Sequence, residues 1–303
     1  MCSLKTWMLS IFGASVLISP ALYGQEFQLA LYPSTTIVPG HLFFDGHYYG
    51  DDNLDESLLR VYYDVLVEVD TTIHEQYRMT EVLSVGKRWT KFQEISRDEY
   101  EQAVRKDYAS AYRSYWKKIC PIAHYLFYAD TYYIDNYSRQ CFFTFKFGAD
   151  DYKITEPAPV IMWEIQDSVK IVAGRECSLA KGHFGGREWE VWFSQEIPYS
   201  SGPWKLSGLP GLILEARERN SQYCFECIGI SSEKVPITMA KYPYSKMTRR
   251  KYNREARLAC EDYVPYINAH ISRVSSLLSI EWKAPMIEKY NRPMGFDLIE
   301  REK

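Results

Sequence analysis

The sequence predicts an α+β fold that is mainly antiparallel β, a curved sheet or half-barrel with helices on one face. Strand-like segments follow one another through short links, without the strand–helix–strand alternation that a parallel sheet requires. Several segments alternate apolar and polar residues, which is typical of strands with one covered face. Aromatic residues make up 16% of the 303 residues, and aromatic side chains are favoured in strands.

The clearest strand pattern covers residues 59–69. Its odd positions are expected to face the core, and they are Leu59, Val61, Tyr63, Val65, Val67 and Val69. Residues 80–95 predict two strands, or one long bent strand, interrupted near Gly86 and Lys87. Further strands are expected at 140–147, 161–166, 168–172 and 189–194, with a flexible loop at 182–186.

Residues 96–118 predict the clearest helix. Ser96 is a suitable N-cap, and Glu99 three residues later would complete a capping box. The residues expected to face the sheet recur at helical spacing and are Tyr100, Val104, Tyr108, Ala111 and Tyr115. Pro121 would end the helix.

The N-terminus has the pattern of a signal peptide. Lys5 precedes an apolar run at 7–18, and the small residues Ala21 and Gly24 lead to an expected mature start at Gln25. A membrane anchor is the alternative, but the run is shorter than the roughly 20 apolar residues of a spanning helix. The sequence therefore predicts a signal peptide at 1–24, a single β-rich domain with C-terminal helices at 25–280, and a polar tail at 281–303, in a periplasmic or secreted protein without a transmembrane segment in the mature chain.

A Pro-Gly turn is expected inside the unusual stretch 202–217. Pro210 at the second turn position and Gly211 at the third predict a type II turn with a positive φ at Gly211. A strand would follow from Leu212, and residues 223–230 would return beside it as a hairpin.

This stretch carries a resemblance to a known family. Gly208, Leu209, Pro210, Gly211, Leu212 and Ile213 spell the hexapeptide that gives the GLPGLI family its name, and Gly202, Pro203 and Trp204 precede it. The chain also resembles the family in the run WFSQEIP at 192–198 and in LSVGKRWTKF at 83–92, over roughly residues 60–235 in all. The resemblance implies an exported bacterial envelope protein with no established activity, and so no catalytic residue to carry over.

Six cysteines follow Gln25, and in an exported protein they are candidates for disulfides of undetermined connectivity: Cys120, Cys141, Cys177, Cys224, Cys227 and Cys260. Cys224 and Cys227 form a CxxC pair, which suggests a redox or metal site. Their place in a predicted strand would turn the two thiols to opposite faces, and no second CxxC or HxxxH completes a metal set.

Charged segments favour solvated surfaces. The net charge of −3 gives no indication of a nucleic-acid binder. Residues 51–56 are rich in acids and predict a solvated loop, because the spacing of an EF-hand calcium loop is absent. A basic helix is expected at 246–257, with Arg250, Arg254 and Arg257 on one face. That face is either solvated or a patch for anionic headgroups. Another short helix is expected at 264–280.

Recognisable catalytic motifs are absent: the sequence has no GxSxG elbow, P-loop, HExxH or dinucleotide fingerprint. No cofactor or metal is expected. The favoured hypothesis is a non-enzymatic binding or carrier module for an apolar or amphipathic ligand, with candidate contacts at Trp192, Tyr62 and His183. The alternatives are an assembly partner of another envelope protein and a hydrolase-type enzyme with a dispersed site. A buried cluster of titratable groups in a pocket would favour the enzyme, and a deep apolar groove without such a cluster would favour the carrier. A flat exposed aromatic patch would favour the partner.

Overall fold

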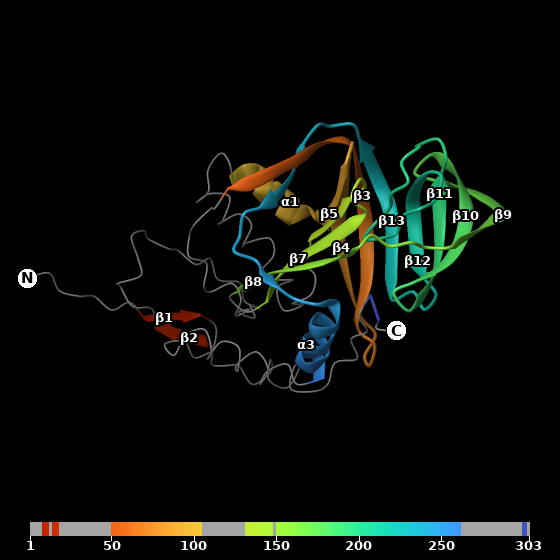
Figure 1. Cartoon of the computed structure of the whole chain (residues 1–303). Helices are drawn as coiled ribbons and strands as arrows, with labels where there is room; N and C mark the ends of the chain where they lie inside the picture. Colours follow the sequence, from red (N-terminus) through yellow and green to blue (C-terminus); the bar gives the residue numbers. More distant parts are fainter. Residues whose placement is uncertain are drawn as a thin grey trace, which may run out of the picture.

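The computed structural model describes residues 8–11, 14–17, 50–104, 131–147, 150–261 and 299–301. Its main feature is one 13-stranded sheet, drawn in Figure 1. Every strand pair in this sheet is antiparallel except β15 with β8. The predicted class, a mainly antiparallel and curved sheet with few helices, is confirmed.

The strand order in the sheet is β15-β8-β7-β6-β5-β4-β3-β13-β12-β11-β10-β9, with β14 paired to β3 beside this path. In chain order, the first six strands of the sheet are β3 (Asp51–Asp70), β4 (Glu75–Gly86), β5 (Trp89–Glu94), β6 (Thr131–Asp135), β7 (Gln140–Phe147) and β8 (Asp150–Pro157). The remaining strands are β9 (Trp163–Val172), β10 (Arg175–Phe184), β11 (Arg187–Ser194), β12 (Leu212–Glu218), β13 (Tyr223–Ser231), β14 (Pro236–Ala240) and β15 (Ser245–Lys246). A separate hairpin joins β1 (Met8–Ile11) and β2 (Ala14–Leu17).

The central strand β3 confirms the predicted alternation. Val61, Tyr63, Val65, Val67 and Val69 are buried, while the residues between them are half-buried. The expected acidic loop at 51–56 is wrong, because this segment is the start of β3 and pairs with β14. The Asp55 carboxylate accepts hydrogen bonds from the backbone amides of Arg88 and Trp89, so it organises the β4–β5 turn.

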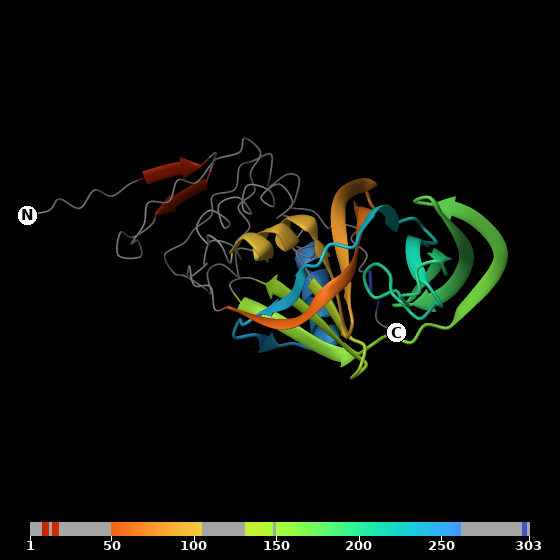
Figure 2. The same cartoon turned by 90° about the horizontal axis from the view of Figure 1, so that it is seen from above.

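The strands β9 to β11 curl round to form the open end of the sheet, at the right of Figure 1. In Figure 2 β9 and β10 bend round the segment that connects β11 to β12. That segment, residues 195–211, includes the first four residues of the GLPGLI hexapeptide, and its buried side chains belong to the same hydrophobic cluster as the inner side chains of β3, β11 and β13. The hollow of the curved sheet is therefore occupied by this chain's own loop.

The two helices contact opposite faces of the sheet, which corrects the expectation that helices cover one face. In β5, Lys91 forms an ion pair with Glu101 of α1 (Ile95–Val104). The next residue, Phe92, points the other way and is paired in register with Tyr132, which is paired in turn with Phe143. Tyr252 of α3 (Arg249–Glu261) packs edge-on against Phe143.

The predicted capping box at the start of α1 is wrong. The helix begins one residue earlier, and the Glu94 carboxylate accepts hydrogen bonds from the Arg97 amide at 3.2 Å and from the Ser96 hydroxyl at 2.7 Å. Glu94 therefore supplies the cap expected of Ser96. The rest of the predicted helix, 105–118, lies outside the described residues, as do the predicted helix at 264–280 and the side chains of the predicted signal peptide.

Candidate functional site

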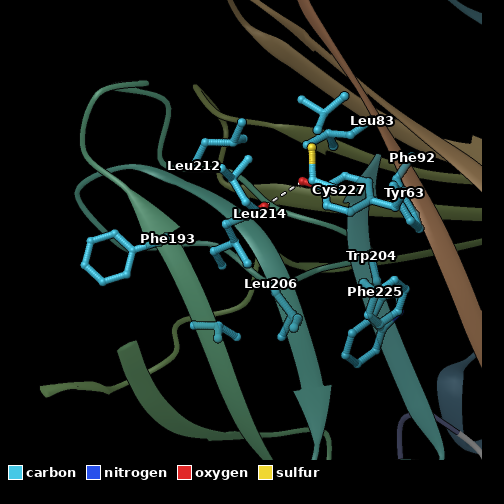
Figure 3. Packing of buried hydrophobic residues seen from close by; sticks show 14 of the residues in the cluster. Tyr63, Leu83, Phe92, Phe193, Trp204, Leu206, Leu212, Leu214, Phe225 and Cys227 are labelled. Atoms are coloured by element: carbon cyan, nitrogen blue, oxygen red, sulfur yellow. Dashed lines mark hydrogen bonds between the residues drawn. The ribbon is translucent and has the colours of Figure 1, made fainter. Parts of the chain in front are cut away.

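The segment 195–211 is held in place at both ends by backbone hydrogen bonds. The Leu212 amide donates to the Ile197 carbonyl, and the Ile213 amide donates to the Ser201 carbonyl, both at 3.0 Å. Between these ties Trp204, Leu206 and Leu209 are buried. Trp204 lies 5.7 Å from Trp189, ring centre to ring centre, and Figure 3 shows it in one cluster with Leu206 and Phe225. The segment is thus part of the core.

Gly211 does not have the positive φ that the turn prediction requires, since the positive value falls on Gly208, at +100°. Gly211 is needed for space instead. A Cβ on it would lie 2.2 Å from the carbonyl oxygen of Ser194 and 2.7 Å from the carbonyl carbon. The hexapeptide therefore brings its backbone against the end of β11, an approach that only glycine allows.

A buried charged cluster ties this segment to the rest of the chain. It consists of Lys205, Glu156, Arg249 and Glu300, and we call it the Lys205 cluster. The Lys205 ammonium, in a residue only 1% exposed, donates to Glu156 and, at 2.6 Å, to Glu300. The Arg249 guanidinium donates to Glu156 at 2.9 Å, and its Nε lies 3.5 Å from Glu300. The cluster joins β8, the segment 195–211, α3 and the C-terminal residues 299–301.

Both carboxylates of the Lys205 cluster are held by cations. Burial raises the pKa of Glu156, but the charges of Lys205 and Arg249 outweigh burial and leave its pKa below the usual value. The Arg249 guanidinium also lies 4.6 Å from the ring centre of Phe143, a cation–π contact. A carboxylate kept ionised in this way is a poor proton donor near neutral pH. The cluster is therefore suited to fixing segments together.

The C-terminal residues 299–301 are part of this assembly. The Arg187 guanidinium donates to the Ile299 carbonyl at 3.1 Å, Asn253 of α3 donates to the Glu300 carbonyl at 3.1 Å, and the Arg301 amide donates to the Gly185 carbonyl at 2.7 Å. The sequence predicted a polar tail over 281–303, but these three residues are anchored in the fold.

A second buried polar group lies on the opposite face, under α1. Arg60 of β3 pairs with Asp98 at 2.5 Å, and Lys91 of β5 pairs with Glu101. The Lys91 ammonium also donates to the Thr238 carbonyl of β14 at 3.0 Å. Burial raises the pKa of Glu101, but the charges of Lys91 and Arg97 outweigh burial, leave its pKa below the usual value and keep the carboxylate ionised. Here too each acid has a basic partner, and the group attaches α1 and β14 to the sheet.

The structure does not gather the three candidate ligand contacts. Tyr62 lies in β3 and Trp192 in β11, with β13 and β12 between them. Each is half-buried and covered by a cation: Arg60 lies 5.6 Å from the Tyr62 ring centre, and Lys170 lies 4.5 Å from that of Trp192. His183, expected in a flexible loop, is an exposed residue of β10 paired in register with Glu188.

The cysteines that the structure describes are all free. They are Cys141, Cys177, Cys224, Cys227 and Cys260, while Cys120 lies outside the described residues. Cys224 and Cys227 lie in β13 as predicted. Burial raises the pKa of the Cys141 thiol to about 11, which disfavours the reactive thiolate. Among the described residues, no three His, Cys, Asp or Glu side chains are close enough together to hold a metal ion.

The most unusual surface is a set of exposed aliphatic residues on β9 and the segment before it, which sequence reasoning missed. The three of them on the strand itself, Ile165, Val169 and Ile171, we call the β9 face, and Val160 and Met162 lie just before the strand. These residues are between 54% and 83% exposed. β9 is the last strand in the sheet order, with β10 as its one neighbour there. The sequence placed strands here but gave no sign that they would form an edge.

The register indicates which way the β9 side chains point. Ile165 pairs with Ala180 and Val169 with Ser178, and these residues pair with Val191 and Phe193 of β11. Paired residues of an antiparallel sheet project to the same face. Ile165 and Val169 therefore continue the inner row of the curved sheet, beyond the part that the segment 195–211 fills.

The exposed face of α3 confirms the predicted helix pattern. Arg250, Arg254 and Arg257 are exposed, while Tyr252 and Ala256 are buried against the sheet. No helix in the described part of the chain is long and apolar enough to cross a membrane.

The fold is thus an open, curved, mainly antiparallel sheet with its own loop in the hollow and an aliphatic edge. A family model described as "Protein of unknown function (Porph_ging)", from an unknown-function family of Bacteroidetes, matches residues 183–215. This match begins at the end of β10 and ends in β12. No curated protein matches the sequence.

Among solved structures, the chain is similar to PNGF-II in two crystal forms, at 12% identity and a TM-score of 0.45. The similarity covers 67% of this chain and 33% or 34% of PNGF-II, so this chain spans about a third of that protein's length.

Proposed function

We propose that this protein is a non-enzymatic binding module of the cell envelope, related to the GLPGLI family, which holds a polypeptide partner against its β9 face. The observation that carries the proposal is the exposure of three aliphatic side chains of the edge strand β9, Ile165, Val169 and Ile171. Contiguous exposed apolar patches on folded proteins commonly mark contact sites. Burying the exposed parts of these three side chains would contribute on the order of 3 kcal/mol before the costs of association.

A polypeptide fits this face better than a small apolar ligand carried in the hollow. The hollow holds Trp204, Leu206 and Leu209 of the chain's own loop, packed in the core. The β9 face is an open rim about 20 Å long between Ile165 and Ile171, at roughly 3.3 Å per residue. An extended or helical segment can lie along such a rim.

The buried charged groups favour a binding role over catalysis. Lys205, Arg249, Arg60 and Lys91 each have a carboxylate partner, and the pairs join distant segments of the chain. A hydrolase-type site would instead need a base or nucleophile whose proton is free to move.

Photo-crosslinking in the native envelope tests the binding role. A photoreactive residue placed at Val169 should capture one discrete protein, and the same residue at Ile73, equally exposed in the β3–β4 turn, should not. The captured protein is then identified by mass spectrometry and its binding measured with purified components. We expect Val169→Ser to weaken that binding and Ile73→Ser to leave it unchanged. Equal effects of the two substitutions would contradict the proposal.

The envelope location is tested separately, by intact-mass analysis of the protein isolated from envelope fractions. We expect a mature chain that starts at or near Gln25. A chain that retains Met1 would contradict the proposed export.

A further inference from the structure

The charges beside the β9 face indicate what kind of partner it takes. Asp167 lies at an odd position of β9, between Ile165 and Val169, and is exposed. Glu176 of β10 pairs in register with Ile171 and is exposed as well. Because paired residues project together, the Glu176 carboxylate stands beside Ile171. Asp167 lies where the β9–β10 register shifts, so it is placed along the edge strand next to Ile165 and Val169.

The basic residues of the same two strands are already paired. Lys170 donates to Glu215 at 2.6 Å, Arg175 donates to Glu196 at 2.9 Å, and Lys181 donates to Glu190 at 2.5 Å. No ion pair among the described residues includes Asp167 or Glu176. The edge formed by β9 and β10 therefore carries two exposed carboxylates, beside the β9 face, that form no ion pair with another described residue.

We infer that the partner of the β9 face is a basic segment of another polypeptide, in which Lys or Arg residues alternate with aliphatic ones. This inference rests on the proposed function and names the chemistry of the partner. The aliphatic residues of the segment would lie on Ile165, Val169 and Ile171, and its basic residues would meet Asp167 and Glu176. Complementary charge of this kind gives specificity and speeds association more than it adds affinity.

The inference also explains why the acids are at this edge. An unpaired, exposed apolar edge invites association with other sheet edges, and charged residues among the apolar ones reduce that hazard. Carboxylates at the edge repel acidic segments and attract basic ones, so the same residues that protect the edge also select the partner.

Two fluorescein-labelled synthetic peptides test the inference, Ac-KVKIKVK-amide and its acidic counterpart Ac-EVEIEVE-amide. Fluorescence polarisation with the folded full chain should show binding of the basic peptide that weakens as salt is added. In the double variant Asp167→Asn/Glu176→Gln, we expect about three- to tenfold weaker binding of the basic peptide. The matched control Glu226→Gln/Glu233→Gln changes two exposed acids at and just after β13 and should leave the affinity unchanged.

The outcomes separate this inference from the proposed function. Equal affinity for both peptides, or an unchanged affinity in the Asp167→Asn/Glu176→Gln variant, overturns the basic partner. If such charge-independent binding is lost in Val169→Ser, the β9 face remains a binding site and only its charge preference is wrong. Binding of the basic peptide that weakens equally in the Glu226→Gln/Glu233→Gln control would show a general charge effect and would also overturn the inference.

Discussion

Substituting Gly211 by alanine should destabilise the protein severely, through a clash with the backbone. The added Cβ would lie 2.2 Å from the Ser194 carbonyl oxygen, 2.7 Å from its carbonyl carbon and 3.0 Å from the Gln195 Cα. None of these atoms belongs to a flexible side chain, so relief requires separating residue 211 from the end of β11. Overpacking of a tight core costs about 1–3 kcal/mol and occasionally more. We expect about 3 kcal/mol or more.

Two other glycines separate this clash from the effect of backbone conformation. Gly174 has φ of +74° and no atom within 4 Å of an added Cβ, and Gly208 has φ of +100° and only the Trp163 ring, at 3.7 Å or more. Alanine at these positions should cost about 1–2 kcal/mol, the penalty of a left-handed conformation. Urea unfolding followed by tryptophan fluorescence measures all three variants. A Gly211→Ala cost no larger than that of Gly174→Ala would refute the close approach.

Three further outcomes are expected. The Glu156 carboxylate has a lowered pKa in the fold, so its contribution to the free energy of unfolding is present above the unfolded-state pKa of 4.5 and is lost as the pH falls through the folded-state pKa. The stability of Glu156→Gln, measured by acid unfolding with circular dichroism, should therefore depend less on pH than that of the wild type. Deleting residues 299–303 leaves Lys205 and Arg249 without Glu300 and should cost about 3 kcal/mol in urea unfolding. Reducing agent should leave the melting temperature unchanged, since the described cysteines are free, and a drop of several degrees would indicate a stabilising disulfide.

The sequence was a good guide wherever burial follows a simple period. The alternation in β3 and the bounds of β7 could be predicted because one face of each strand is apolar. The two faces of α3 could be predicted for the same reason. Local turn chemistry was less reliable: Pro210-Gly211 has the composition of a type II turn, but the positive φ falls on Gly208, and Gly211 lies against the Ser194 carbonyl.

Partners far apart in the sequence could not be predicted. Glu156, Lys205, Arg249 and Glu300 look like ordinary surface charges, and only the folded chain brings the three half-buried side chains together around the buried Lys205. The pairing of residues 51–56 with β14 was missed because an acidic run is typical of a loop until a strand pairs with it. The β9 face was missed because a strand's own residues do not reveal whether it lies at the edge or in the middle of a sheet.

Binding of an environment-sensitive apolar dye, such as bis-ANS, tests most directly whether the β9 face is open in solution. The triple variant Ile165→Ser/Val169→Ser/Ile171→Ser should lose most of the dye fluorescence while keeping the wild-type urea midpoint. The control Ile73→Ser/Ile228→Ser removes two exposed aliphatic residues elsewhere and should keep the fluorescence. Equal fluorescence in the wild type and the triple variant would contradict an exposed apolar binding face on β9.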